Sequence, residues 1–224
     1  MAKVGFRILP VAKRPDKKLL AELAKMVTPH LSDSMERLYA GGAQLRPMHD
    51  GTKLCGPAFT VRTSPGDNLL VHKAIDIAEP GDVIVVDAGG VCDNAIIGEL
   101  MSARAEQRGV AGMVIWGAIR DSKELREGSF PVYASGVTHR GPYKNGPGEI
   151  NVAISIGGMT VNPGDVIVGD ADGLVAIPQD QAEAVLASAK AILAKEEKSM
   201  KEIKAGTVDR SWVDKALKEK GYQV

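Results

Sequence analysis

The chain contains 224 residues, and its 28 lysines and arginines are balanced by 28 aspartates and glutamates. This balance excludes a general electrostatic attraction to nucleic acid or to an anionic membrane surface, so neither is expected as a partner. Hydrophobic residues make up 44% of the chain, as in ordinary folded proteins. There is no apolar run of 18 residues, and residues 1–14 lack the apolar segment of a signal peptide. We therefore expect a cytoplasmic protein without a membrane span, and we interpret Cys55 and Cys92 as free thiols rather than a disulfide.

Two short helices are predicted near the beginning of the chain. The first follows Pro15, and Pro29 is expected to end it, because apolar residues recur on one helical face between them: Leu20, Leu23 and Val27. The second is predicted from Asp33, since Glu36 stands three residues later as in an acidic variant of the capping box.

The middle of the chain alternates between strand and helix patterns. We predict strands at 58–63, 83–86 and 113–116, a helix at 69–78, and a second helix that begins between residues 93 and 98 and ends near 108. This order is that of a βαβ-like unit, in which polar residues follow neighbouring strands at the same sheet edge. The unit could bring together Asp87, Gly98-Glu99 and Arg120-Asp121.

The last part of the chain predicts short strands and then helices. Strands are expected at 132–134, 152–156, 166–168 and 174–177, with a glycine-rich, charged loop at 136–149 that is either a lid or simply solvated. Residues 162–168 repeat the Pro-Gly-Asp turn and strand of 79–85, which we interpret as one turn type used twice. Helices are predicted at 181–204 and 211–220. We expect a compact unit at 1–180 and a C-terminal helical extension at 181–224 that packs on a neighbouring subunit.

The stretch from 98 to 121 carries the most specific chemistry. Arginine binds carboxylates through a planar fork, and aspartate is an oxygen ligand that Mg²⁺ or Mn²⁺ accepts, so Arg120 and Asp121 are candidates for holding a metal-chelated 2-oxo acid. The alternative is a surface salt bridge. Gly98 and Glu99 begin a predicted helix, whose free N–H groups bind anions; the alternative is a glycine needed only for packing.

Other candidates for chemistry are weaker. His72 and His139 are candidates for proton transfer, although such histidines more often lie on a helix surface or in a loop. Glu99 is a better candidate for positioning a proton-carrying water if it faces Arg120. The sequence contains no phosphate-binding loop, no zinc-type His/Cys spacing and no G-x-S-x-G nucleophile motif.

Several motifs together resemble those of the RraA-like proteins, which comprise 4-hydroxy-4-methyl-2-oxoglutarate / 4-carboxy-4-hydroxy-2-oxoadipate aldolases and regulators of ribonuclease E activity. The resemblance covers about residues 32–178 and is carried by the following motifs: Gly66-Asp67-Asn68, Gly98-Glu99-Leu100, Gly109, Gly112, Gly117, Arg120-Asp121-x-x-Glu124, Arg140-Gly141-Pro142-Tyr143-Lys144 and Gly169-Asp170-x-Asp172-Gly173.

The resemblance implies an α/β fold with mixed β-sheet layers and helices, of the swivelling phosphohistidine-domain type, assembled as a homotrimer or hexamer with its site at the subunit interface. It implies that Asp121 is the metal ligand, that Arg120 binds the oxo-acid end of the substrate, and that Glu99 occupies an acidic position of the family. It also implies that the backbone of Gly98, Glu99, Leu100 and Met101 holds the substrate carboxylate. A glutamate of the neighbour's C-terminal helix would approach the metal, and Glu196 or Glu197 is the candidate here.

The function implied is a divalent-metal-dependent class II aldolase. It would cleave a 4-hydroxy-2-oxo acid to pyruvate and a second oxo acid, with oxaloacetate decarboxylation as a side activity. The alternative is a binding protein that resembles the ribonuclease E regulators and has no catalytic role. Trp116 stands where many members of the family have an aspartate, which bears on the choice of substrate.

Overall fold

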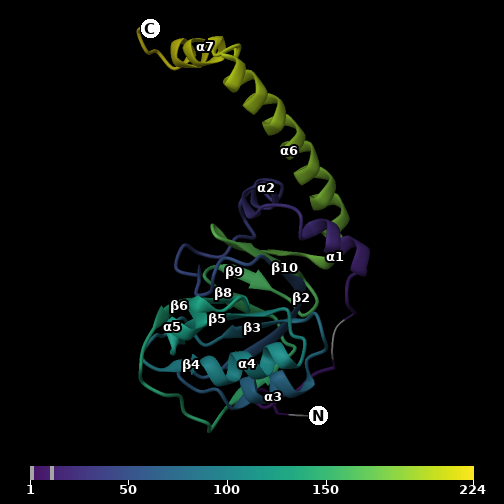
Figure 1. Ribbon diagram of the computed structural model, residues 1–224, viewed down its shortest axis with the longest axis vertical. Coiled ribbons are helices and arrows are strands. Elements are labelled where there is room, and N and C mark those ends of the chain that lie inside the picture. Colours follow the sequence, from purple (N-terminus) through teal and green to yellow (C-terminus); the bar gives the residue numbers. More distant parts are fainter. Residues whose placement is uncertain (1–2, 11–12) are drawn as a thin grey trace.

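The computed structural model describes residues 3–10 and 13–224 of the chain (Figure 1). Residues 1–2 and 11–12, part of the predicted unit at 1–180, lie outside the described residues. The helices are α1 Lys17–Leu23, α2 Thr28–Asp33, α3 Leu69–Ile77, α4 Glu99–Gln107, α5 Ser122–Glu127, η1 Gln179–Gln181, α6 Ala182–Ala205 and α7 Ser211–Glu219. The strands are β1 Arg46–Pro47, β2 Leu54–Thr63, β3 Val83–Asp87, β4 Ala95–Ile97, β5 Gly112–Ile119, β6 Val132–Val137, β7 Gly148–Ile150, β8 Ile154–Ile156, β9 Met159–Val161, β10 Val166–Asp170 and β11 Gly173–Ile177.

The fold is a mixed α/β structure built on one strongly curved sheet. Its strand order is β1-β6-β5-β3-β2-β10-β11, with β4 paired to β5 and β7 paired to β2. The strands β2, β3, β5 and β6 run parallel to one another, whereas β10 and β11 are antiparallel additions. Ala40, which precedes β1 in the chain, bridges to Val175 of β11, so the two ends of the sheet approach one another. The sheet is therefore nearly closed, like a barrel. The predicted likeness to swivelling phosphohistidine domains stays a prediction.

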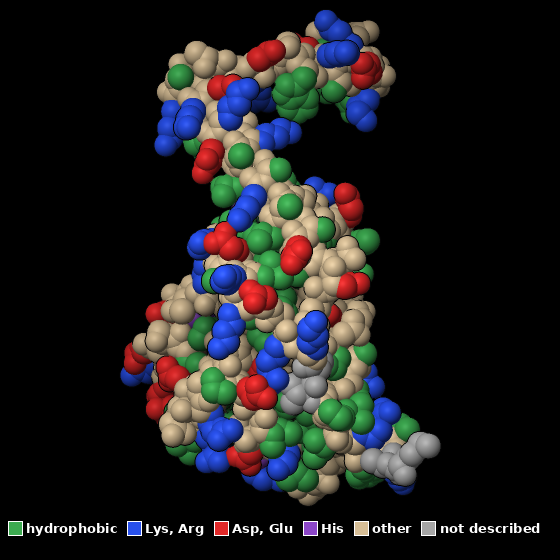
Figure 2. Space-filling view, turned by 90° about the vertical axis from the view of Figure 1, so that its right-hand side faces the viewer, with side chains coloured by type: hydrophobic (Ala, Val, Ile, Leu, Met, Phe, Trp, Pro, Cys, Tyr) green, Lys and Arg blue, Asp and Glu red, His purple; other side chains and the backbone are tan. Residues whose placement is uncertain are grey.

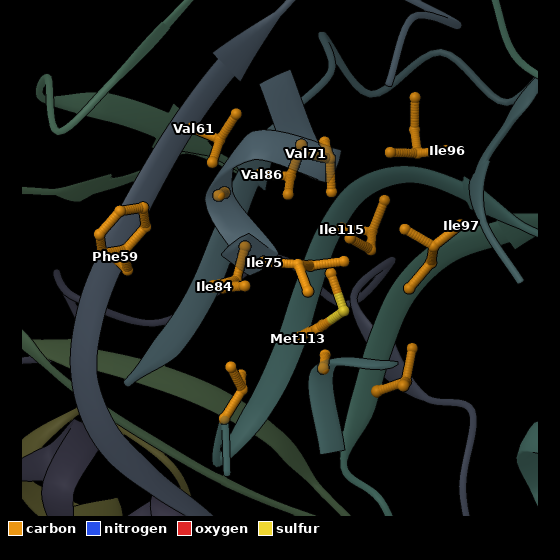
Figure 3. Packing of buried hydrophobic residues seen from close by; sticks show 14 of the residues in the cluster. Phe59, Val61, Val71, Ile75, Ile84, Val86, Ile96, Ile97, Met113 and Ile115 are labelled. Carbon is orange, nitrogen blue, oxygen red and sulfur yellow. The ribbon is translucent and has the colours of Figure 1, made fainter. Parts of the chain in front are cut away.

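The core has three parts that follow from the alternation of side chains along the strands. One face of β2, β3 and β5 packs against α3 and α4 through residues such as Ile75, Ile84 and Met113 (Figure 3). The other face fills the sheet interior, where Tyr133 donates a hydrogen bond to the carbonyl of Asp170 across the barrel at 2.9 Å. The third part lies between β10, β11 and the helices α1, α2 and α6.

The predictions for the first helices are partly wrong. Pro29 does not end a helix; it lies in the first turn of α2, where its missing N–H costs nothing. The helix predicted from Asp33 onward does not form, because α2 ends at Asp33 and both Glu36 and Arg37 adopt left-handed backbone angles, with φ of 53° and 64°. The start of α2 is fixed instead by a distant residue: the Asp170 carboxylate accepts hydrogen bonds from the Thr28 N–H and hydroxyl at 2.8 and 2.6 Å.

The alternating middle part is predicted largely correctly, with two corrections. The strands at 58–63, 83–86 and 113–116 and the helix at 69–78 form, although β2 begins at Leu54 and β5 continues to Ile119. Residues 95–97, expected at or before a helix start, form the short strand β4, and the helix begins at Glu99. The strands β1, β7 and β9 were not predicted, because two or three residues are too few to show a periodic pattern.

The repeated Pro-Gly-Asp turn has the same geometry at both positions. Asp82 accepts a hydrogen bond from the N–H of Glu79 at 2.9 Å, and Asp165 accepts one from the N–H of Asn162 at 2.8 Å. The surroundings differ, because Arg14 donates two hydrogen bonds to Asp82 at 2.8 and 2.7 Å, whereas Asp165 has no such cation among the described residues. Burial accordingly raises the pKa of Asp165.

The helices α6 and α7 form an arm that leaves the body of the molecule (Figure 1). The first half of α6 is anchored, since Ala182, Val185 and Ala189 are buried, and the second half and α7 stand clear of the sheet. In Figure 2 the arm carries basic and acidic side chains side by side. Within residues 3–10 and 13–224, no helix has the length and apolar character needed to cross a membrane.

The two turns predict opposite effects of one substitution. Asp165→Asn stabilises the protein near pH 7, because the raised folded-state pKa means that the ionised carboxyl is less favourable in the folded chain than in the unfolded one. This advantage shrinks as the pH falls toward the unfolded-state pKa of about 4, because the native carboxyl, whose pKa is raised, is protonated before the unfolded one. Asp82→Asn is the matched control and destabilises the protein by about 3 kcal/mol, since it breaks a buried ion pair. Urea unfolding at pH 4 and pH 7 measures both, and a destabilised Asp165→Asn protein at pH 7 would contradict the assignment.

Candidate functional site

The stretch from 98 to 121 is brought together by the pairing of β4 with β5. Ala95 pairs with Ala118, and the N–H of Arg120 donates to the carbonyl of Ile97 at 3.0 Å. The residues that follow β4 and β5 therefore leave the sheet side by side. The segment after β4 enters α4, and the segment after β5 enters α5. The N–H of Glu99 donates to the Oδ2 atom of Asp121 at 3.0 Å. The predicted proximity of Gly98-Glu99 and Arg120-Asp121 is present.

Gly98 leaves no room for a side chain. A Cβ atom there would overlap Oδ2 of Asp121 and lie 2.8 Å from Cγ of Arg120. The backbone angle φ of Gly98 is −152°, which any residue can adopt, so the glycine is required by the close approach of these two side chains and not by its own conformation.

The Arg120 and Asp121 side chains are half-exposed and lie side by side. The guanidinium Nε of Arg120 is 3.8 Å from Oδ2 of Asp121, and the two side chains are 44% and 38% exposed. Asp121 adopts a left-handed backbone conformation, with φ of 54° and ψ of 42°, which aspartate and asparagine tolerate better than most residues. Its carboxylate is thus aimed back across the N-terminus of α4 rather than along α5.

The first turn of α4 completes the site. A helix leaves the N–H groups of its first turn without partners inside the helix, so the amides of Leu100 and Met101 are available to an anion. The side chain of Leu100 is 80% exposed, which leaves the approach to these amides open. The predicted set Gly98, Glu99, Leu100 and Met101 therefore lies beside Arg120 and Asp121 as one surface.

Two hollows meet at Arg120 and Asp121. The tight hollow has a volume of about 30 Å³, lies over the start of α4 and is also lined by Asn68 and Pro142. The wide hollow has a volume of about 320 Å³, lies on the other side of the pair and is also lined by Val137 and His139. The tight hollow holds only about two water molecules, so a substrate must extend beyond it.

Asn68 is a residue of the site that sequence reasoning did not assign. It is buried, its Nδ2 donates to the carbonyl of Ile96 at 2.8 Å, and its Oδ1 atom has no hydrogen-bond partner in the structure. Such an atom next to a hollow is a ready acceptor for a ligand or a water. Its membership of the Gly66-Asp67-Asn68 motif was the available signal, but the motif alone does not indicate a direction for the side chain.

The predicted loop at 136–149 is held in place as a strap, which we define as residues 138–147. Its first residue donates its N–H to the carbonyl of Ile119 at 2.9 Å, and its middle is fixed by a hydrogen bond from the N–H of Ala95 to the carbonyl of Arg140 at 2.8 Å. Its far end is fixed by the buried carboxylate of Asp67, whose Oδ2 accepts the N–H groups of Asn145 and Gly146 at 2.6 and 3.0 Å. The strap is therefore a rigid wall of the site.

Three other predicted residues lie away from the Arg120-Asp121 pair. Asp87 pairs in register with Trp116, four residues and roughly 13 Å before Arg120 along β5, and its carboxylate accepts the N–H of Gly89 instead. Trp116 packs on Gly90 and against the core inside the sheet, and it lines neither hollow. His72 lies on α3, and burial lowers its pKa.

Two of the predicted glutamates, Glu99 and Glu196, lie away from the Arg120-Asp121 pair or are engaged elsewhere. The side chain of Glu99 borders a separate groove together with Glu106 and Glu124. It forms no hydrogen bond or ion pair with Arg120. Glu196 is engaged inside its own chain, because its carboxylate lies 2.7 Å from Nε2 of the buried His30. This contact fastens α6 to α2 at the point where the arm leaves the body.

The donor set fits a weakly chelated divalent cation. Within residues 3–10 and 13–224, no cluster of three His, Cys, Asp or Glu side chains is present. Asp121 offers one carboxylate whose Oδ1 makes no hydrogen bond within the described chain, and Asn68, whose buried Oδ1 has no partner there, lines the adjacent hollow. Mg²⁺ and Mn²⁺ accept one or two protein carboxylates and take other ligands from water and substrate.

The chain is thus a mixed α/β protein whose nearly closed sheet carries an arginine–aspartate pair beside a helix N-terminus. Residues 28–176 match the family described as RraA-like: Aldolase/RraA, and the chain belongs to the RraA-like family. The resemblance drawn from the sequence motifs is therefore confirmed.

Three relatives show how far the similarity extends. A Halalkalibacterium halodurans protein named "Putative 4-hydroxy-4-methyl-2-oxoglutarate aldolase" is 43% identical over 171 residues, which cover 76% of this chain and 81% of that protein. The crystal structure of an uncharacterized Pseudomonas syringae protein matches with a TM-score of 0.78 and 28% identity, over 89% of this chain and 95% of its own. Streptomyces coelicolor RraAS2, of the RNase ES inhibitor RraA family, matches with a TM-score of 0.76 and 28% identity, over 84% of this chain and 98% of its own.

The packing at Gly98 predicts a sharp effect of one methyl group. Gly98→Ala displaces the Asp121 carboxylate, because the added Cβ overlaps Oδ2. Since Asp121 is the predicted metal ligand, we expect this change to weaken Mn²⁺ binding by about tenfold or more. Gly128→Ala is the matched control, since its Cβ would meet only ordinary contacts, the nearest at 3.4 Å. Mn²⁺ binding by electron paramagnetic resonance and the melting temperature are measured together. Equal Mn²⁺ affinity in the two variants would contradict the role of this close approach.

Proposed function

We propose that this protein is a divalent-metal-dependent class II aldolase that cleaves a 4-hydroxy-2-oxo acid to pyruvate and a second oxo acid. The expected substrates are 4-hydroxy-4-methyl-2-oxoglutarate or 4-carboxy-4-hydroxy-2-oxoadipate, with oxaloacetate decarboxylation as a side activity. The observation that carries the proposal is the contact of Asp121 with the first amide of α4, beside Arg120. Family membership and the printed name of the Halalkalibacterium relative support it.

The chain's own residues bind and orient the 2-oxo acid. The amides of Leu100 and Met101 receive its C1 carboxylate at the positive end of α4. The guanidinium of Arg120 lies beside the 2-oxo oxygen and stabilises the negative charge that develops there as the C3–C4 bond breaks. Asp121 would hold Mg²⁺ or Mn²⁺, which supplies Lewis-acid stabilisation of that same charge and makes a lysine Schiff base unnecessary.

Two proton transfers accompany the cleavage. The C4 hydroxyl loses its proton as the C3–C4 electron pair moves to C3, and C3 of the pyruvate fragment later gains a proton. We assign both transfers to water positioned at the start of α4, with the Glu99 carboxylate as the nearest acidic group of that turn. This role for Glu99 rests on its position as the first residue of α4. In the single chain its side chain borders the groove that also contains Glu106.

We propose that a neighbouring subunit completes the site. The tight hollow is too small to enclose a substrate, and the arm of α6 and α7 exposes apolar side chains that have no cover in the single chain: Met200, Ile203, Val208, Trp212, Tyr222 and Val224. Packing of this arm on the next subunit of a homotrimer, or of a hexamer made of two trimers, would bury them. Since Glu196 is held by His30, Glu197 is the residue that we expect to approach the neighbour's cation.

The second candidate function is a binding protein that regulates a ribonuclease. The match to RraAS2 over 84% of this chain favours it, because that protein belongs to an RNase ES inhibitor family. In this case the Arg120-Asp121 surface would have no catalytic role, and its substitution would leave inhibition of a ribonuclease unchanged.

Asp121→Asn tests the catalytic assignment. Asparagine tolerates the left-handed conformation of this residue, so the substitution removes the charge without straining the backbone. We expect a fall of about 100-fold or more in pyruvate release from oxaloacetate with Mg²⁺, and a similar loss on adding a chelator to the native enzyme. Spontaneous decarboxylation by Mg²⁺ alone is subtracted. Activity that is indifferent to both the substitution and the chelator would refute the metal assignment.

Mixed oligomers test the shared site. Glu197→Gln lowers aldolase activity about tenfold or more by weakening the cation site of the neighbour. Glu196→Gln is the matched control, because it mainly weakens the contact between α6 and His30 of α2. Co-refolding Glu197→Gln chains with Asp121→Asn chains gives more activity than the mean of the two separate preparations, since some interfaces then combine two native halves. No such gain in the mixture, despite exchange of subunits shown by mass spectrometry, would argue against a site shared between chains.

A further inference from the structure

The wide hollow beside Arg120 and Asp121 is not used by the chemistry at C1 to C4 of the substrate. It has a volume of about 320 Å³, about ten times that of the tight hollow, and opens on the other side of the same two side chains. Its remaining lining consists of Ser122 at the start of α5 and three consecutive residues where β6 meets the strap: Val137, Thr138 and His139. A substrate seated over α4 must place its far end here, against the neighbouring subunit or in solvent.

The charges around the wide hollow favour an anion. Residues 137–148 contain His139, Arg140 and Lys144 and no acidic residue, in a chain whose total charge is balanced. The only carboxylate that lines the hollow is Asp121, which the proposed cation neutralises. His139 and Arg120 are thus the charged or chargeable donors at its wall, with the hydroxyls of Ser122 and Thr138 beside them.

The wall that carries His139 is held in a fixed place. The N–H of Thr138 donates to the carbonyl of Ile119 at 2.9 Å, and the carbonyl of Arg140 accepts from Ala95 at 2.8 Å, so His139 lies between two backbone anchors. With its backbone held in this way, His139 gives up only the freedom of its own side chain when it binds a ligand. The geometry is that of a preformed wall and not of a loop that must fold over the ligand.

We propose that the wide hollow is the subsite for a second carboxylate of the substrate, with the imidazole of His139 as its contact. This inference rests on the proposed function, which places the first carboxylate at the amides of Leu100 and Met101. In a five-carbon 2-oxo acid the far carboxyl carbon is three C–C bonds from C2, about 4 Å when extended, which suits two hollows that share Arg120 and Asp121. The subsite explains selection for 2-oxo acids with a carboxylate at C5 over those with a methyl group.

Binding of two unreactive analogues tests the subsite without catalysis. With Mg²⁺ present, isothermal titration compares 2-oxoglutarate with 2-oxopentanoate, which has a methyl group in place of the far carboxylate. The native protein binds 2-oxoglutarate about tenfold more tightly, as one hydrogen bond to a charged group predicts. His139→Gln abolishes the preference, whereas His72→Gln, a histidine on α3 that lines neither hollow, retains it. Equal binding of both acids by the native protein, or an unchanged preference in His139→Gln, would overturn the subsite.

A second measurement separates this inference from the proposed function. Exchange of the methyl protons of pyruvate with deuterium from solvent, followed by NMR, needs only the tight hollow and the cation site. Exchange that is equal in native and His139→Gln proteins, together with the lost preference, supports both proposals. Absence of exchange in the native protein, with the preference for 2-oxoglutarate present and lost in His139→Gln, refutes the aldolase and supports the carboxylate subsite. A parallel loss of exchange in His139→Gln would overturn the assignment of His139 to the far carboxylate.

Discussion

The arrangement of the site depends on one close contact, between the backbone at Gly98 and the carboxylate of Asp121. The pairing of β4 with β5 delivers these two points to the same place, and the missing Cβ lets them touch. The left-handed backbone of Asp121 then turns its carboxylate toward the first amide of α4. Because each step relies on the one before, an error in the register of β4 would separate the anion-binding amides from Arg120 and Asp121.

Under the proposed function, the residues of one chain form only part of the site. It offers a single carboxylate, two free amides and an arginine around a hollow of about 30 Å³, which is enough to grip one end of a small acid but not to exclude water from it. Exclusion of water strengthens every electrostatic interaction in such a site, so catalysis by this surface requires a cover. Under the proposed function this cover is a second copy of the chain, which would also bury the exposed apolar side chains of the arm.

The regular elements with a clear periodic pattern were predictable, and the short ones were not. The parallel strands β3 and β5 are largely apolar runs, the later part of β2 alternates, and the arm begins with a long charged helix, so local sequence determines them. The strands β4 and β7 have three residues each and exist because a neighbouring strand supplies their hydrogen bonds. The start of α2 was misplaced for a similar reason, since its cap is Asp170, 142 residues away.

Reading along the chain was sufficient to identify the family, the mixed α/β class and the candidate residues, because motifs such as Arg120-Asp121 are continuous in sequence. The folded arrangement set which candidates meet: it brought Gly98 beside Asp121 and left Asp87 hydrogen-bonded to Gly89. It also added Asn68 at the tight hollow and placed His139, a candidate from the sequence, at the wide one. The reason is physical. Spacing along a chain constrains neighbours within an element, whereas a site is made where separate elements end, and those positions are set by strand register and by the packing of helices on the sheet.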